Sequence, residues 1–163
     1  MFPLDNRGEM MWNLPVEADV QTEQVKILDA IVEELKAQKA TSFSVIGNRV
    51  VFKGGPFRFV SGWNVLFSIS SGYIEASPAK GGLLVSYYLS FGQLLIVASV
   101  LCFIFGLDLL RDKSLPMIGK LVLPFLALLF LFGMNYLLTV IRFPSFLRQS
   151  LDKGSSVVIR ASN

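Results

Sequence analysis

The residues best suited to binding a charged ligand lie in one glycine-rich stretch, between Lys53 and Trp63. There Lys53 and Arg58 alternate with aromatic rings and glycines, a combination that can bind phosphates or nucleic-acid bases. The stretch lacks the spacing of a phosphate-binding loop, and Phe57 and Phe59 flank Arg58 as in an edge strand that packs both rings inward. We therefore expect this stretch to be a structural strand. The alternative is that Lys53 and Arg58 contact lipid head groups, and we expect no nucleic-acid partner.

The residue types present exclude many kinds of catalytic and metal-binding site. The chain has no histidine, and its single cysteine, Cys102, lies inside an apolar run. These facts exclude an intramolecular disulfide, a zinc site built from Cys and His, and nucleophiles that need an imidazole base. Glu33 and Glu34 fall on a predicted helix and Glu75 on a predicted strand, so no carboxylate pair is placed for acid-base catalysis. We expect no enzymatic activity and no cofactor, and we identify no small-molecule substrate.

Two long apolar runs dominate the second half of the chain. Apolar residues make up 53% of the 163 residues, and the mean hydropathy is +0.57. Residues 88–107 and 121–141 carry no charge, and each is long enough for roughly 30 Å of helix, the thickness of a bilayer core. The short polar connection at 108–115 predicts an antiparallel transmembrane hairpin within residues 83–141. The alternative, two helices buried in a soluble core, needs more chain to cover them than this protein has.

The orientation of this hairpin is predicted from charge. The first residues lack the basic start and apolar core of a secretory signal, so nothing directs the N-terminal domain to export. The segment after the second run is basic, whereas the basic residues of the loop are offset by Asp108 and Asp112. Because basic residues favour the cytoplasmic side, we expect a multi-pass membrane protein with both termini in the cytoplasm.

Polar side chains interrupt the apolar runs near the predicted cytoplasmic side. They are Ser90, Gln93, Asn135 and Thr139. In an antiparallel hairpin Ser90 lies level with Thr139, and Gln93 with Asn135. An unpaired amide is costly in hydrocarbon, so we expect a hydrogen bond of about 1 kcal/mol between Gln93 and Asn135, which serves helix packing rather than chemistry.

Small residues form a separate stripe on the first run. Ala98, Cys102 and Gly106 recur at intervals of four, nearly opposite Gln93 around the helix. One partner helix cannot easily cover both faces. Either the amides pair within the hairpin and the small residues receive another subunit, or the reverse arrangement holds. We predict that the protein associates with itself or with a larger membrane protein through the first run.

The tail, residues 142–163, is basic and partly apolar. Four apolar residues share one side of a helix drawn through it: Phe143, Phe146, Leu147 and Leu151. Such a helix would lie in the membrane interface, with Arg142 and Arg148 near anionic lipid, where each basic residue adds about 1 kcal/mol. Because Pro144 interrupts its beginning, a short disordered end is the alternative.

Residues 1–82 predict a small α+β domain, with one helix on an antiparallel sheet. The helix is capped by Thr22, ends near Lys39 and carries an apolar stripe at spacings of three and four: Val25, Leu28, Ile31, Val32 and Leu35. Alternating apolar residues predict strands at 10–14, 43–45, 50–52, 63–69, 73–77 and 83–87, with turns at 47–48 and 71–72. The last strand continues directly into the first apolar run.

These patterns together predict a membrane-anchored, non-enzymatic protein whose cytoplasmic α+β domain mediates protein interaction or assembles a membrane complex. The alternative is a module that binds lipid head groups or senses the membrane surface, using Lys53, Arg58 and the basic tail. A third interpretation is an enzyme whose reaction uses groups from a partner chain. The expected partners are the lipid bilayer and a second protein chain.

Overall fold

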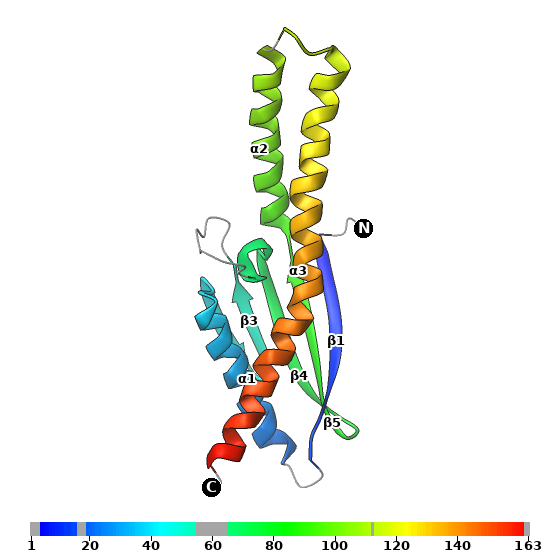
Figure 1. The fold of residues 1–163 in the computed structure, drawn as a ribbon. Helices are drawn as coiled ribbons and strands as arrows, with labels where there is room; N and C mark the ends of the chain where they lie inside the picture. Colours follow the sequence, from blue (N-terminus) through cyan, green and yellow to red (C-terminus); the bar gives the residue numbers. More distant parts are fainter. Residues whose placement is uncertain (1–3, 16–18, 55–64, 112, 162–163) are drawn as a thin grey trace.

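The computed structural model describes residues 4–15, 19–54, 65–111 and 113–161 of the chain, and Figure 1 shows two parts. An antiparallel sheet covered by helices forms one part, and two long helices that project from it form the other. The elements are β1 (Asp5–Asn13), α1 (Val20–Ala37), β2 (Ser42–Ile46), β3 (Arg49–Lys53), the short 3-10 helix η1 (Val65–Ser68), β4 (Ser71–Ala79), β5 (Gly82–Ser90), α2 (Gly92–Arg111) and α3 (Met117–Ala161).

The sheet has five strands in the order β1-β5-β4-β3-β2, and all neighbouring strands are antiparallel. A two-residue turn at Gly47 and Asn48 joins β2 to β3, which confirms the predicted hairpin. Gly47 has a φ of 61°, as the first central residue of a type II′ turn requires. β1 pairs with β5 along its full length. In this order β1 and β2 are the two edge strands of the sheet.

Several predicted strand boundaries are wrong. β1 begins at Asp5 and β5 continues to Ser90, while Ser71 and Gly72 belong to β4 rather than to a turn. Residues 65–68, predicted as part of a strand, form η1. Leu66 and Ile69 are buried whereas Phe67 is exposed, so side chains three apart face the core, as they do in a 3-10 helix.

α1 lies against the sheet, with Asp19 rather than Thr22 as its N-cap. The Asp19 carboxylate accepts a hydrogen bond from the Thr22 backbone N–H at 3.2 Å, and the bonds from Thr22 hold the pKa of Asp19 below its usual 3.8. The buried stripe is Ile27, Leu28, Ile31, Val32 and Leu35. Val25, predicted in that stripe, is exposed because the stripe centres on Ile31, roughly a third of a turn away at about 100° per residue.

A second helix also covers the sheet. α3 is one continuous helix of 45 residues, and its C-terminal half crosses the sheet beside α1 (Figure 1). Its apolar residues Phe143, Phe146, Leu147 and Leu151 are buried in the domain core. A single covering helix is therefore not confirmed. The apolar side predicted to face lipid faces the sheet instead, and Pro144 lies inside the helix without ending it.

The two projecting helices coincide broadly with the predicted apolar runs. Gly92–Arg111 and Met117–Lys153 are long and apolar enough to cross a membrane. The first run was predicted to become helical at residue 88, but α2 begins four residues later. Tyr88, Leu89 and Ser90 belong to β5 and pair with β4 and β1. Apolar strand residues that lead into an apolar helix leave no change of composition to mark the boundary.

Candidate functional site

The candidate site lies at the junction where the sheet meets the two apolar helices. Only the buried Phe91 separates β5 from α2, and its backbone N–H donates to the Leu4 carbonyl at 2.8 Å. On the other side of β5, the Ser70 N–H donates to the Ser90 carbonyl at 2.7 Å, and the Gln93 N–H donates to Ser70 Oγ at 2.7 Å. The start of α2 is therefore tied to the neighbouring segments before β1 and β4.

Aromatic contacts tie α3 to the same junction. Phe91 meets Tyr136 edge-on with ring centroids 4.8 Å apart, and Tyr136 stacks on Phe132 at 5.9 Å. Such ring pairs contribute about 0.5–1.5 kcal/mol each beyond their burial. The middle of α3 is thus fixed where α2 leaves the sheet.

Further along α3, Phe143 anchors the helix on the sheet. Its ring centroid lies 4.9 Å from that of Tyr87 in β5 and 6.5 Å from that of Phe52 in β3. The Tyr87 ring can lie across β1 because Gly8 has no side chain, and a Cβ there would collide with the ring. At the far end, Lys153 Nζ lies 2.7 Å from Glu34 Oε2 on α1. The lysine is exposed and the glutamate partly covered, and such a surface pair adds at most about 1 kcal/mol.

The small residues of α2 face α3 of the same chain. Ala98 and Cys102 are buried, and a Cβ added at Gly106 would lie 3.3 Å from Pro124 Cγ of α3. Of the two predicted arrangements, this is the one in which the small residues pack within the hairpin. Close approach of two helices at small residues is a common packing mode in membranes.

The polar residues predicted to join the helices do not do so as expected. Ser90 is not in the first helix, because it is the last residue of β5 and pairs with Asp5 and Ser71. Asn135 Nδ2 donates to the Leu131 carbonyl at 2.7 Å, and Thr139 Oγ1 donates to the Asn135 carbonyl at 2.8 Å, both within α3. Among the described residues no hydrogen bond joins the side chains of Gln93 and Asn135. A helix supplies such side chains with acceptors on its own preceding turn.

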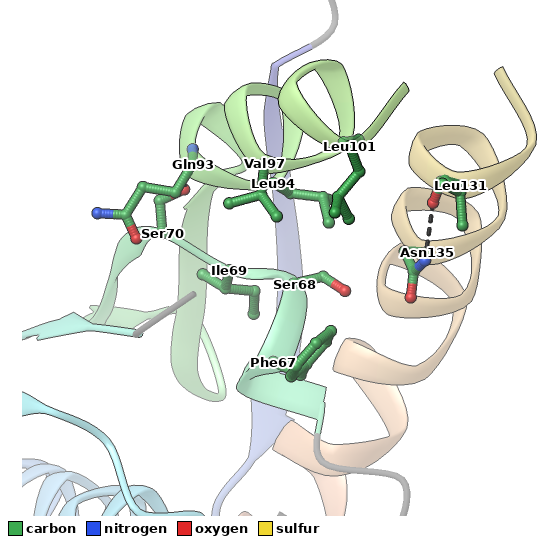
Figure 2. A pocket seen from close by; sticks show the side chains of 11 residues that line it. Phe67, Ser68, Ile69, Ser70, Gln93, Leu94, Val97, Leu101, Leu131 and Asn135 are labelled. Atoms are coloured by element: carbon green, nitrogen blue, oxygen red, sulfur yellow. Dashed lines mark hydrogen bonds between the residues drawn. The ribbon is translucent and has the colours of Figure 1, made fainter. Parts of the chain in front are cut away.

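Gln93 and Asn135 instead line one cavity of about 220 Å³ at the junction. Figure 2 shows the first turns of α2 on one side of it, η1 and the residues after it opposite, and α3 as the third wall. Its lining is Phe67, Ser68, Ile69, Ser70, Gln93, Leu94, Val97, Ala98, Leu101, Leu131 and Asn135. Ile69 and Ala98 are buried while Phe67, Leu101 and Leu131 are exposed, so the cavity has a closed floor and an open rim.

The Ser68 hydroxyl is the polar group that sequence reasoning missed. The residue is 5% exposed, and in Figure 2 its hydroxyl points across the cavity toward α3. It has no hydrogen-bond partner among the described residues. The hydroxyl borders the cavity, so it is free to donate to whatever fills the cavity. The alternating pattern at 63–69 gave no signal for it, since a strand would have placed Ser68 on the solvent side.

The predicted lipid-contact residues are not gathered into one site. Arg58 lies outside the described residues. Lys53 alternates with the buried Phe52, so it lies on the outer face of the sheet, whereas Arg142 and Arg148 belong to the helix that covers the inner face. The sheet therefore separates Lys53 from the two arginines.

The outer face of the sheet carries a paired polar and aromatic cluster. Arg49 donates to Glu75 Oε2 through Nη2 at 2.6 Å and through Nε at 3.1 Å, and Asn48 Nδ2 donates to Glu75 Oε1 at 3.1 Å. The hydrogen bonds from Arg49 are the main cause that holds the pKa of Glu75 below its usual 4.5. Arg49 also lies 4.2 Å from the centroid of the Tyr73 ring, which stacks on Tyr88 at 5.4 Å. These groups satisfy one another, which is typical of a structural surface.

Known proteins provide no guide to this site. In the described part of the chain, no three Cys, Asp or Glu residues lie close enough together to hold a metal ion. Comparison with protein-family models, with curated proteins and with solved structures gives no match.

Proposed function

We propose that this chain is a multi-pass membrane protein whose α+β domain is held against the membrane and binds another protein chain, as part of a membrane complex. The observation that carries this proposal is β2, an edge strand with exposed apolar side chains on a domain that is rigidly joined to two apolar helices. The proposed role is non-enzymatic.

The exposure of the two helices supports their place in lipid. Of the most apolar windows of α2 and α3, 11% and 0% are buried. A core helix of a soluble protein would be mostly buried, and a signal sequence would lie near the N-terminus. Continuous apolar surface on both helices, such as Phe103, Ile118 and Phe130, is typical of a membrane contact.

The charges on either side of the hairpin support the orientation. Arg142, Arg148 and Lys153 follow the apolar part of α3 on the domain side. At the far end of the hairpin Arg111, Lys113 and Lys120 are partly offset by Asp108 and Asp112. Basic residues concentrate on the cytoplasmic side of membrane proteins. The domain and both termini are therefore in the cytoplasm, and the short loop is across the membrane.

The exposed side chains of β2 support protein binding. Every residue of Ser42–Ile46 is exposed, and Val45 and Ile46 are exposed by 51% and 64%. Phe43 and Val45 pair with Phe52 and Val50, so they lie on the inner face, where Lys36 of α1 reaches over the Phe43 ring but both side chains stay exposed. Proline and charged residues usually protect an edge strand against pairing with another chain, and β2 contains neither.

The backbone of β2 supports a partner strand in particular. In a hairpin with a two-residue turn, the pair next to the turn, Ile46 and Arg49, exchanges hydrogen bonds, and bonded pairs then alternate along the ladder. The N–H and C=O groups of Phe43 and Val45 thus point away from β3. An extended segment of another protein, with alternating apolar residues, would bind these groups and continue the inner apolar layer.

Photo-crosslinking in native membranes tests this assignment. A photoreactive amino acid at Ser44 is expected to give one discrete product, and the same amino acid at the exposed Glu33 of α1 is expected to give none. Val45→Pro should abolish the product, because it removes the outward N–H and blocks a sixth strand, while an edge strand tolerates proline. Val45→Thr keeps the N–H and should keep the product.

The mass and crosslinked peptide of the product identify the occupant. A product of twice 18.1 kDa would mean that the strand comes from a second copy. Equal crosslinking from Ser44 and Glu33, or a product that survives Val45→Pro in a domain of unchanged thermal stability, would contradict strand addition at β2.

A further inference from the structure

We propose that the junction cavity binds one acyl chain of a glycerolipid from the surrounding bilayer, with the ester end of the lipid at Ser68 and Asn135. This inference rests on the proposed membrane position of α2 and α3. It assigns a lipid site inside the fold, distinct from contact of basic residues with head groups.

The cavity is polar at the end nearest the sheet and apolar farther along the helices. A lipid changes in the same order, from its ester to its acyl chain. Its polar groups belong to Ser68, Ser70, Gln93 and Asn135, which lie at the end of the hairpin nearest the sheet. Farther from the sheet, its walls are Val97, Leu101 and Leu131. In the proposed orientation the first group lies at the level of the membrane surface and the second deeper in hydrocarbon, so the gradient matches that of an ester followed by its acyl chain.

The size and rim of the cavity suit a chain segment. Its volume of about 220 Å³ is below the roughly 300–1,000 Å³ of pockets that enclose a drug-sized molecule. Leu101 and Leu131 at its rim are themselves exposed, so a chain can enter sideways from the bilayer without crossing the domain. The polar groups at the end of the cavity nearest the sheet suit the ester of a lipid, and the apolar walls suit its chain.

Ser68 and Asn135 provide the donors for the ester. The Ser68 hydroxyl is 5% exposed, has no partner among the described residues and points toward α3 (Figure 2). Asn135 Nδ2 uses one N–H on the Leu131 carbonyl, at 2.7 Å, and has a second. Ser70 Oγ accepts from the Gln93 N–H, and its own O–H remains a third possible donor at this end of the cavity. An ester carbonyl between Ser68 and Asn135 would satisfy donors that the protein leaves unpaired.

The test uses the full chain in nanodiscs that contain a phosphatidylcholine with a diazirine in the middle of one acyl chain. After illumination, mass spectrometry locates the label. We expect the label to concentrate on peptides that carry residues 94–101 and 131–135. Val97→Phe places a ring in the cavity, so the acyl chain loses apolar contacts there. We expect the labelling to fall about tenfold, the change in occupancy that corresponds to one lost apolar contact. The matched control Val100→Phe adds the same ring on the same helix outside the cavity lining and should leave the labelling unchanged.

A second variant probes the polar end without filling space. Ser68→Ala should lower the labelling about threefold to tenfold, the effect of one lost hydrogen bond. Label spread evenly over the outer surface of α2 and α3, or equal labelling of Val97→Phe and Val100→Phe, would overturn the lipid site while leaving the membrane position intact. Failure of the wild-type chain to remain in alkali-washed membranes would instead overturn the membrane position, and the lipid site with it.

Discussion

Phe143→Ala is expected to destabilise the α+β domain by about 3–5 kcal/mol, a large part of the roughly 5–15 kcal/mol that stabilises an ordinary domain. The Phe143 side chain is fully buried and contacts the rings of Tyr87, Phe52 and Phe146. Its loss leaves a cavity between α3 and the sheet. Denaturation in mild detergent, in a Trp63→Phe background so that the fluorescence comes from Trp12 beside the core, measures the change.

Phe130→Ala is the matched control for this prediction. Phe130 lies on the same helix, but it is 65% exposed on the apolar part of α3. Its removal should leave the unfolding of the domain within about 0.5 kcal/mol of the wild type. Equal effects of the two substitutions would mean that the C-terminal half of α3 is not part of the domain core, and that the tail is interfacial or disordered, as the sequence suggested.

Replacing Ala98 and Gly106 together with leucine is expected to separate α2 from α3. Gly106 leaves room for Pro124 and no more, so leucine there overpacks the interface at about 1–3 kcal/mol, while leucine at the buried Ala98 enters the cavity between α2 and α3. The buried Cys102 lies between them and reports the change directly. We expect its reaction with a membrane-permeable maleimide to accelerate in the double variant, and the thermal stability in detergent to fall.

Ser99→Leu provides the control, because Ser99 is an exposed small residue of the same helix. It should change neither the reactivity of Cys102 nor the thermal stability. If the double leucine variant kept the stability of the monomer but lost a larger complex, the small residues would serve another subunit, as one of the two sequence interpretations held. That result would contradict the packing of α2 on α3.

Local patterns in the sequence predicted the elements that depend on neighbours along the chain. Three features were readable because each depends only on residues close together in sequence. They are the apolar spacing of α1, the glycine turn between β2 and β3, and the two charge-free runs. The boundary between β5 and α2 could not be located. Residues 83–91 are mostly apolar because β5 lies in the domain core, and the residues that follow are mostly apolar along α2, so composition does not mark the boundary.

The long-range features could not be predicted. The tail's apolar residues Phe143, Phe146, Leu147 and Leu151 show the spacing of a helix face, but spacing does not tell whether lipid or a sheet covers that face. The cavity combines η1, α2 and α3, which lie far apart in sequence, and η1 was mistaken for a strand. Asn135 was expected to need a partner helix, yet its own helix provides the acceptor.

The central claim is that α3 is a single helix whose N-terminal half crosses the membrane and whose C-terminal half completes the cytoplasmic domain. Labelling of single cysteines in intact cells, in a Cys102→Ala background, tests it most directly. With a membrane-impermeant maleimide, cysteine at the exposed Lys113 in the loop should react from outside, and cysteine at the exposed Arg148 only after the membrane is permeabilised. Reaction of both positions from the same side of the membrane would contradict the claim.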